Sequence, residues 1–216
     1  MTSILFECHH FYYLPNFLPI IEEFQQRDGY SLSASIPHII NDLERRHLCK
    51  AVETVGIEFI DGDNEATRQA ELRRRKFDVI IVGIPGMLEK VVSDNTVAVM
   101  VYHGIGLKES YYRDTSPRIN IRTVESQERY DELIRRGETN LALTGYTKID
   151  PLASTDSQKN NQFLETLNFS PDRPTLLYAP TFYPSSVEQV LPKLPGLAQE
   201  LNVIIKLHGF SWSQRR

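Results

Sequence analysis

Short apolar runs alternate with longer amphipathic segments between residues 3 and 143, and this alternation limits the fold more than any other feature of the chain. A short apolar run is typical of a buried strand, whereas apolar residues at helical spacing indicate a helix packed on one face. Buried strands separated by helices predict an α/β fold with a mostly parallel sheet covered on both faces. The predicted strands are 3–8, 30–36, 57–60, 78–84, 97–102, 119–124 and 140–143, and the predicted helices are 16–27, 38–55, 65–76 and 126–136. The inner face of the 38–55 helix is predicted to carry Ile39, Ile40, Leu43, Leu48 and Val52.

The pattern changes after Asp150. Residues 151–161 are polar and contain no aliphatic run, so we predict a linker over 151–171 with a short helix at 162–167 inside it. One βαβ unit follows, with strands at 175–179 and 203–207 and a helix from about 185 to 201. Two parallel strands with few covering helices do not form a stable domain. We therefore predict a first domain at 1–150 and an incomplete second one at 172–216: either its strands join the first sheet, or the chain is the front part of a longer protein.

The composition excludes several classes of protein. The formal net charge of −4 over 216 residues argues against a general nucleic-acid binder, which usually carries a basic face. Two cysteines do not make a disulfide framework, and Cys8 ends an apolar run where a small buried residue is expected. The N-terminus lacks the features of a signal peptide, and no stretch reaches the ~18 apolar residues that a membrane span needs. We predict a cytoplasmic protein with no nucleic-acid partner.

A peripheral contact with the inner face of the cell membrane stays open. The run RRRK at residues 73–76 is either a solvated helix end or a site for acidic lipid headgroups.

Ligands bind beyond the carboxyl ends of the strands in open α/β sheets, so the residues that directly follow strands are the candidate site residues. His103 follows the fifth strand and could take a proton from a hydroxyl near neutral pH. Gly104 lets a ligand approach the backbone, and Lys108 could neutralise a phosphate. The alternative is that His103 caps a loop and is bonded to a backbone carbonyl.

Three further groups follow strands. Lys206 and His208 stand two apart at the end of the last strand, where they would point the same way and suit a phosphate; the alternative is an edge strand with solvated ends. The loop that holds Gly145, Lys148 and Asp150 is a plain turn from its spacing alone. The pair at residues 9 and 10, two histidines before an aromatic run, is either packed or catalytic.

No metal or cofactor is predicted. The chain has no pair of Cys or His residues with zinc-site spacing and no carboxylate cluster at the strand ends. It has no GxxxxGK[ST], GxGxxG or GxSxG motif, and GIPG at 83–86 is too loose for a dinucleotide fingerprint.

Four motifs in order carry a resemblance: YHGIGLK, TGYTKIDPL, LLYAPTF and VIIKLHG, which together span residues 102–209. This order resembles the CDP-glycerol glycerophosphotransferase family, whose members build teichoic-acid and related polyol-phosphate polymers of the cell envelope. The resemblance implies a GT-B fold, in which two Rossmann-like domains face each other across a cleft. The N-terminal domain would bind the acceptor, and the C-terminal domain would bind the nucleotide donor.

The resemblance also implies roles for single residues. His103 would be the base for the acceptor hydroxyl, while His208 and Lys206 would lie near the donor phosphates. The partners would be a CDP-activated polyol donor and a polyol-phosphate or glycan-lipid acceptor, with no bound metal or cofactor. The remaining residues implied in substrate binding are Gly104, Lys108, Gly145, Lys148, Asp150 and Thr181.

Three departures from the family pattern leave the substrate open. Ile105-Gly106 stands in place of a Thr-Pro-like pair, Thr147-Lys148 in place of Pro-Arg, and Gly209 in place of proline. Glycerol phosphate, ribitol phosphate and a sugar donor all remain candidates. Two other classes compete with the transferase: another GT-B enzyme, such as a nucleotide-sugar glycosyltransferase or epimerase, and a non-catalytic remnant that binds a glycan or a partner chain.

Overall fold

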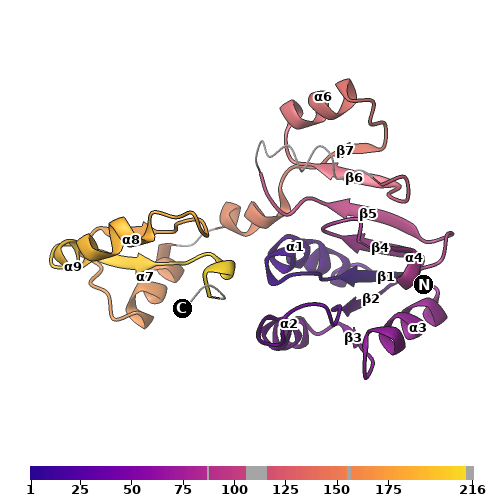
Figure 1. The fold of residues 1–216 in the computed structure, drawn as a ribbon, viewed down its shortest axis with the longest axis horizontal. Coiled ribbons are helices and arrows are strands. Elements are labelled where there is room, and N and C mark those ends of the chain that lie inside the picture. Colours follow the sequence, from indigo (N-terminus) through magenta and orange to yellow (C-terminus); the bar gives the residue numbers. More distant parts are fainter. Residues whose placement is uncertain (87, 106–115, 155–156, 213–216) are drawn as a thin grey trace. The chain divides into compact units, whose positions relative to one another are not determined.

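The computed structural model describes residues 1–86, 88–105, 116–154 and 157–212 (Figure 1). The chain divides into two compact units, Met1–Ala153 and Ser154–Arg216. No helix in the described ranges is both long and apolar enough to cross a bilayer.

The first unit is built on a seven-stranded sheet with the order β3-β2-β1-β4-β5-β6-β7, and every neighbouring pair is parallel. This confirms the predicted parallel α/β sheet, and each predicted strand of the first domain is present. The strands are β1 (Thr2–Glu7), β2 (Tyr30–Ser35), β3 (Glu58–Ile60), β4 (Val79–Val82), β5 (Val97–Val101), β6 (Ile121–Val124) and β7 (Leu141–Leu143).

Helices cover both faces of this sheet (Figure 1). One apolar cluster joins α1 and α2 to the sheet through Phe17, Ile21, Leu48 and Val52, and a second joins α3, α4 and α6 through residues that include Leu72. Cys8 is fully buried in the first cluster, as predicted. The helices are η1 (Phe11–Tyr13), α1 (Leu14–Gln25), α2 (Asp42–Val55), α3 (Glu65–Arg75), α4 (Leu88–Val91) and α6 (Gln127–Arg135).

The start of α2 corrects the sequence prediction. Asn41 caps the helix by accepting a hydrogen bond from the backbone N of Glu44, so residues 38–40 lie in the preceding turn. Ile39 is therefore 85% exposed instead of lying on the inner face, and Leu43 is 55% exposed. The predicted burial of Ile40, Leu48 and Val52 is confirmed.

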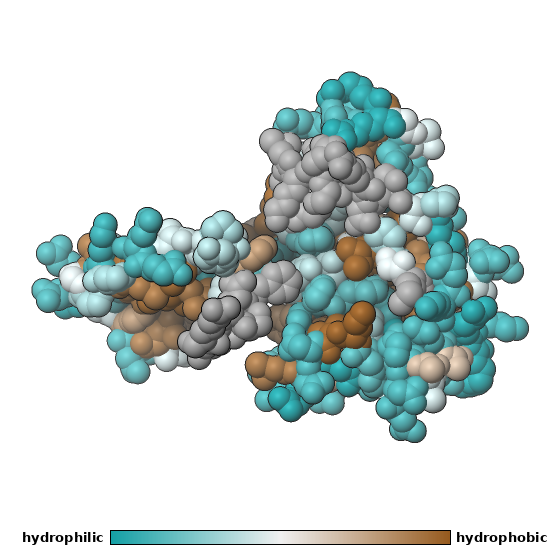
Figure 2. Space-filling view, viewed as in Figure 1, coloured by the Kyte–Doolittle hydropathy of each residue, from teal (hydrophilic) through white to brown (hydrophobic). Residues whose placement is uncertain are grey.

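The second unit contains a separate two-stranded parallel sheet of β8 (Thr175–Tyr178) and β9 (Asn202–Ile205). These strands do not join the first sheet. Exposed apolar side chains remain on Phe163, Leu177 and Ile205, and Figure 2 shows a hydrophobic area on the surface of this unit. A parallel sheet is normally covered on both faces, so this unit keeps apolar surface that a larger sheet would bury.

One helical prediction in this region was wrong, and the short helix predicted at 162–167 is present as part of a longer one. The predicted helix from 185 to 201 is broken into α8 (Val187–Val190), η3 (Leu191–Lys193) and α9 (Leu194–Leu197), because Pro192 and Pro195 interrupt the helical hydrogen bonds. The polar segment 151–161 is not extended linker throughout: η2 (Thr147–Ser154) ends in it and α7 (Ser157–Thr166) begins in it.

Candidate functional site

The strand order places β1 beside β4, which is the point where the order of the sheet reverses. Ligands of open α/β sheets bind in the crevice outside the carboxyl ends of the strands at such a switch point. The loops after β1, β4 and β5 meet there, and the loop after β7 reaches them.

Four aromatic rings gather at this edge, and we call His10, Tyr12, Tyr13 and His103 the histidine–tyrosine cluster. The His103 ring centroid lies 5.1 Å from that of Tyr12 and 4.8 Å from that of Tyr13, edge-on to the latter. His10 stacks on Tyr12 at 5.0 Å with an angle of 10° between the ring planes. The structure therefore brings His103 together with His10, which the sequence left undecided between packing and catalysis.

The glycines of GIPG make room for this cluster and its neighbour His9. A Cβ on Gly83 would lie 2.3 Å from Cδ1 of Tyr13, and a Cβ on Gly86 would lie 2.8 Å from Nε2 of His9. Gly86 also has a positive φ of 53°, which favours glycine. Both glycines thus serve close packing of the loop after β4 against the loop after β1.

The loop after β7 is fastened to the same edge. The Tyr146 hydroxyl donates a hydrogen bond of 2.9 Å to the carbonyl oxygen of His103, and the Thr147 hydroxyl donates one of 2.7 Å to the carbonyl oxygen of Asn16. Gly145, Lys148 and Asp150 lie in this segment and are exposed. Gly104 follows His103 directly and is half-buried, whereas Lys108 lies outside the described residues.

A buried ion pair lies at the carboxyl ends of β1 and β2, on the other side of the switch point. Nη1 of Arg68 donates to both carboxylate oxygens of Glu7, at 2.9 and 3.0 Å, and to the Ser35 hydroxyl at 2.8 Å. Its Nε and Nη2 donate to the two oxygens of Glu65. Arg68 and Glu7 are 1% and 2% exposed. We call Glu7, Ser35, Glu65 and Arg68 the arginine network.

Two carboxylates, those of Glu7 and Glu65, share one guanidinium in this network, and their pKa values are shifted in opposite directions. Burial raises the pKa of Glu7 to about 7, although the charge of Arg68 and its hydrogen bond act in the opposite direction. Burial also opposes ionisation of Glu65, but hydrogen bonds from Arg68 and from the backbone N of His38 lower its pKa to about 2. Glu65 therefore carries the charge that matches Arg68 at neutral pH.

His9 lies between the two regions. Burial, with the nearby charges of Arg68 and His10, lowers the pKa of the His9 imidazole to about 4. The ring is neutral at physiological pH, so it can accept or donate a hydrogen bond without carrying charge.

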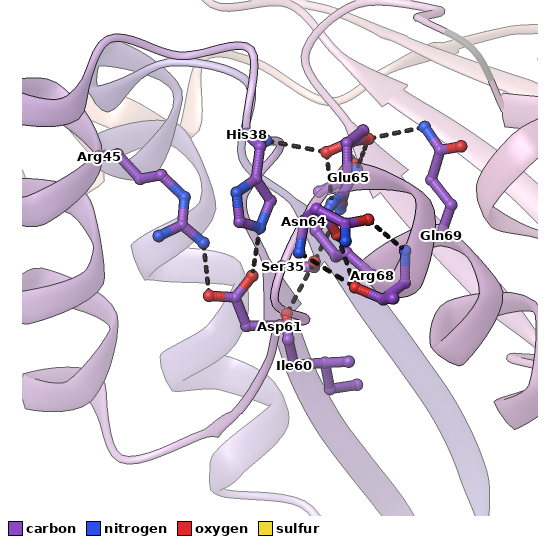
Figure 3. Close-up of polar contacts among 11 residues, drawn as sticks. Ser35, His38, Arg45, Ile60, Asp61, Asn64, Glu65, Arg68 and Gln69 are labelled. Carbon is purple, nitrogen blue, oxygen red and sulfur yellow. Dashed lines mark hydrogen bonds and ion pairs between the residues drawn. The ribbon is translucent and has the colours of Figure 1, made fainter.

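A histidine–carboxylate contact lies beside the arginine network (Figure 3). Nε2 of His38 lies 3.0 Å from Oδ1 of Asp61, and Nη2 of Arg45 lies 2.5 Å from Oδ2 of the same carboxylate. Hydrogen bonds from Arg45 and His38 lower the pKa of Asp61 against the effect of burial. The contacts join α2, the loop after β2 and the loop after β3.

The predicted donor-side residues lie in the second unit. β9 ends at Ile205, so Lys206 and His208 follow the strand and do not share its alternation, which removes the argument that they point the same way. Lys206 is exposed, and its backbone N donates to the carbonyl oxygen of Tyr178. The His208 ring packs 4.8 Å from the Phe182 ring, and Thr181 is exposed.

The sequence analysis missed the arginine network, although two signals pointed to it. Glu7 interrupts the apolar run SILFEC, and a carboxylate inside a buried strand needs a partner. Arg68 stands four residues before Leu72, which places both on the inner face of α3. By contrast, the run at 73–76 is exposed, which fits both alternatives given for it, and its ion pairs include those of Arg74 and Arg75 with Glu71.

Among the described residues, no group of three His, Cys, Asp or Glu side chains is arranged to hold a metal ion.

Solved structures resemble the chain in fold. No family profile matches the sequence, and a search of curated proteins finds no match. MnaA of S. aureus, in a co-structure with UDP, has a TM-score of 0.63 at 12% identity, over 97% of this chain and 63% of that chain. A putative UDP-N-acetylglucosamine 2-epimerase from Listeria monocytogenes has a TM-score of 0.61 at 12% identity, over 99% and 65%. A glycosyltransferase from Rickettsia africae has a TM-score of 0.54 at 9% identity, over 95% and 68%.

The chain has the Rossmann-like fold of GT-B proteins. At these identities the likeness shows the fold alone, and it gives no support to the CDP-glycerol glycerophosphotransferase family in particular. The chain spans 63% and 65% of the length of the first two structures.

Proposed function

We propose that this chain belongs to a GT-B enzyme that acts on a substrate activated by a nucleoside diphosphate. The observation that carries this proposal is the hydrogen bond from Tyr146 to the carbonyl oxygen of His103. It joins two segments, YHG and TGYTKID, that were singled out by the sequence as candidate site segments and whose bonded residues are 43 positions apart. Both segments meet at the edge of the sheet where α/β proteins bind ligands.

The donor class is supported by the fold. Structures that resemble this chain include one solved with UDP and one described as a UDP-N-acetylglucosamine 2-epimerase. The order of four motifs favours a CDP-activated polyol instead. We propose CDP-glycerol or a related CDP-polyol as the donor, with a UDP-sugar as the second candidate.

The chemistry in either case is attack of an acceptor hydroxyl on the activated donor. A histidine at the sheet edge takes the proton of the hydroxyl, and basic groups stabilise the charge on the leaving nucleotide. The resemblance assigns these tasks to His103 and to Lys206 with His208. Cytoplasmic localisation and a polyol-phosphate or glycan-lipid acceptor are part of the same proposal.

Calorimetry on the 216-residue chain would test the donor by comparing CDP-glycerol with UDP-N-acetylglucosamine. We expect CDP-glycerol to bind at least about tenfold more tightly, a difference of about 1.4 kcal/mol. Tighter binding of the UDP-sugar would overturn the CDP-polyol assignment, and the absence of binding by either would overturn a nucleotide-activated donor. Lys206→Ala should weaken the binding, with Lys193→Ala as the matched lysine control in the same unit.

Turnover would test the reaction. Polyol-phosphate transfer from CDP-glycerol releases CMP, and sugar transfer from a UDP-sugar releases UDP. If His103 takes the proton, as the resemblance implies, His103→Ala should lower the rate by about 100-fold with folding intact, the size of a typical general acid–base contribution. A loss of less than about threefold would remove His103 from the chemistry.

A further inference from the structure

His10 has the surroundings of an acid–base residue. It lies in the loop after β1 at the switch point, and its side chain is 32% exposed. Its Nδ1 lies 3.3 Å from Oε1 of Glu44, which comes from the first turn of α2. A carboxylate can only accept a hydrogen bond, so Nδ1 carries the proton and Nε2 carries the lone pair.

Glu44 is itself fixed in place. The backbone N of Phe11 donates to its Oε1 at 2.8 Å, and Nδ2 of Asn41 donates to its Oε2 at 3.0 Å. Its backbone N is held by the side chain of Asn41. A base, a carboxylate that orients the base, and groups that orient the carboxylate are the parts of a proton-transfer site.

The contact between His38 and Asp61 is similar to that between His10 and Glu44, but the two carboxylates differ in their other partners. Asp61 accepts from the guanidinium of Arg45, so its negative charge is already matched (Figure 3). Within the described ranges, the other hydrogen-bond donors to Glu44 are an amide side chain and a backbone N–H, both neutral. The negative charge of Glu44 can therefore stabilise an imidazolium at His10. The charge of Asp61, by contrast, is already paired with the guanidinium of Arg45.

We infer that the pair of His10 and Glu44 is the proton acceptor for the attacking hydroxyl in this site. This rests on the proposed function, since it needs a hydroxyl acceptor. The hydroxyl oxygen forms a bond to the donor phosphorus or carbon while its proton moves to Nε2 of His10. The nucleotide leaves with the electron pair of the bond that breaks. Glu44 stabilises the imidazolium, which then releases the proton to the solvent.

This assignment places His103 in a different position from His10. The resemblance gives the proton-accepting role to His103, and the inference gives it to His10 instead. His103, which packs against both tyrosines, would then position the acceptor without taking its proton. The titratable groups around His10 are Glu44 from α2, His9 in its own loop, Tyr12 and Tyr13 from η1, and His103 behind the tyrosines.

The first test uses kinetics of the whole chain with the donor identified by turnover. We expect His10→Gln to lower kcat by about 100-fold with little change in KM. The acidic limb of the pH profile of kcat should disappear in His10→Gln and remain in His103→Gln. Glu44→Gln should lower kcat at least about tenfold. His38→Gln, the matched histidine with a carboxylate partner, and His47→Gln on the exposed face of α2 should change kcat by less than about threefold.

The second test does not require turnover. Nitrogen-15 NMR of the His10 ring should show the proton on Nδ1, and Glu44→Gln should reduce that preference. Glycerol 3-phosphate, added as the acceptor probe, should shift the His10 ring signals and leave those of His47 unchanged.

The outcomes separate the two proposals. Active wild-type enzyme with an active His10→Gln variant would overturn the assignment of His10 and leave the proposed function intact. Absence of turnover with every donor would overturn the proposed function. In that case the NMR result decides, and a proton on Nε2 or His10 signals unmoved by the probe would overturn the pair.

Discussion

The polar groups on the two sides of the switch point differ in their burial and in how their charges are paired. On one side, the arginine network buries the carboxylate of Glu7 and the guanidinium of Arg68, while Glu65 is half-buried. Each Arg68 nitrogen has a hydrogen-bond partner in it. On the other, the histidine–tyrosine cluster holds partly exposed imidazoles between aromatic rings, and Glu44 keeps its negative charge unmatched among the described residues.

This difference indicates that the arginine network contributes to folding stability and the histidine–tyrosine cluster to the reaction. A buried group with matched charge has no capacity left for a ligand, and its loss is expected to affect folding. A half-buried histidine with an oriented carboxylate can change its protonation state at little structural cost. The comparison therefore predicts that variants on the arginine side mainly change the free energy of unfolding, while variants in the histidine–tyrosine cluster mainly change the rate.

The largest effect is expected from Arg68→Met. Removing the guanidinium leaves the buried carboxylate of Glu7 without its partner, and breaking a buried pair in this way costs about 3 to 5 kcal/mol. The loss should be smaller at pH 5 than at pH 8, because protonated Glu7 needs no counter-charge. Urea unfolding at both pH values measures it.

Arg74→Met is the matched control on the same helix. Arg74 pairs with Glu71 at the surface, and screening by solvent leaves an exposed pair of this kind with little net effect on the free energy of unfolding. Equal losses in Arg68→Met and Arg74→Met would contradict the role of burial.

The second prediction concerns pH and the Glu7 carboxyl. Its pKa is raised from 4.5 to about 7, so its contribution to stability is fully present below pH 4.5 and is lost as the pH rises through 7. Glu7→Gln imitates the protonated form. The variant should therefore gain stability relative to the wild type between pH 5 and pH 8, by a few kcal/mol.

His9 should act in the reverse direction. Its pKa is lowered from 6.5 to about 4, so its contribution is present above pH 6.5 and is lost as the pH falls through 4. The two groups oppose each other between pH 4.5 and 6.5, and the wild type should show a flatter pH dependence there than Glu7→Gln or His9→Gln. A stability curve of Glu7→Gln parallel to that of the wild type would contradict the raised pKa.

The third prediction addresses the packing of the loop after β4 against the histidine–tyrosine cluster. Gly83→Ala would place a methyl group 2.3 Å from the ring of Tyr13, which is buried and cannot move aside. Overpacking of this kind costs about 1 to 3 kcal/mol. In a Tyr13→Ala background the added methyl group has room, so the extra cost should vanish. Additive effects in the double variant would show that the two residues do not meet.

The sequence predicted the sheet well and the site only in part. The seven strands were found because buried parallel strands are short continuous apolar runs, which the one-dimensional pattern records directly. The error at Ile39 and Leu43 arose because Asn41 starts α2 later than the apolar spacing suggested. Local capping decided the boundary, and periodicity could not.

The sequence pattern could not predict which polar side chains pair with one another. Glu7 and Arg68 are separated by 61 positions, and Glu44 lies 34 positions after His10. Which carboxylate meets which histidine or arginine depends on strand order, which the sequence did not determine. This is why His103 was found from its place after a strand, while the carboxylate beside His10 was not.

The smallest effect is expected from Tyr146→Phe, which removes the hydroxyl that donates to the carbonyl oxygen of His103. A hydrogen bond of this kind contributes about 0.5 to 1.5 kcal/mol, so the free energy of unfolding should fall by about 1 kcal/mol. If the loop after β7 holds His103 for the reaction, the variant should also lower the rate more than this stability loss explains. Tyr130→Phe, on α6, is the control for loss of a tyrosine hydroxyl. A Tyr146→Phe enzyme with wild-type rate and reduced stability would show that this hydrogen bond stabilises the fold, as the arginine network does, and has no part in the reaction.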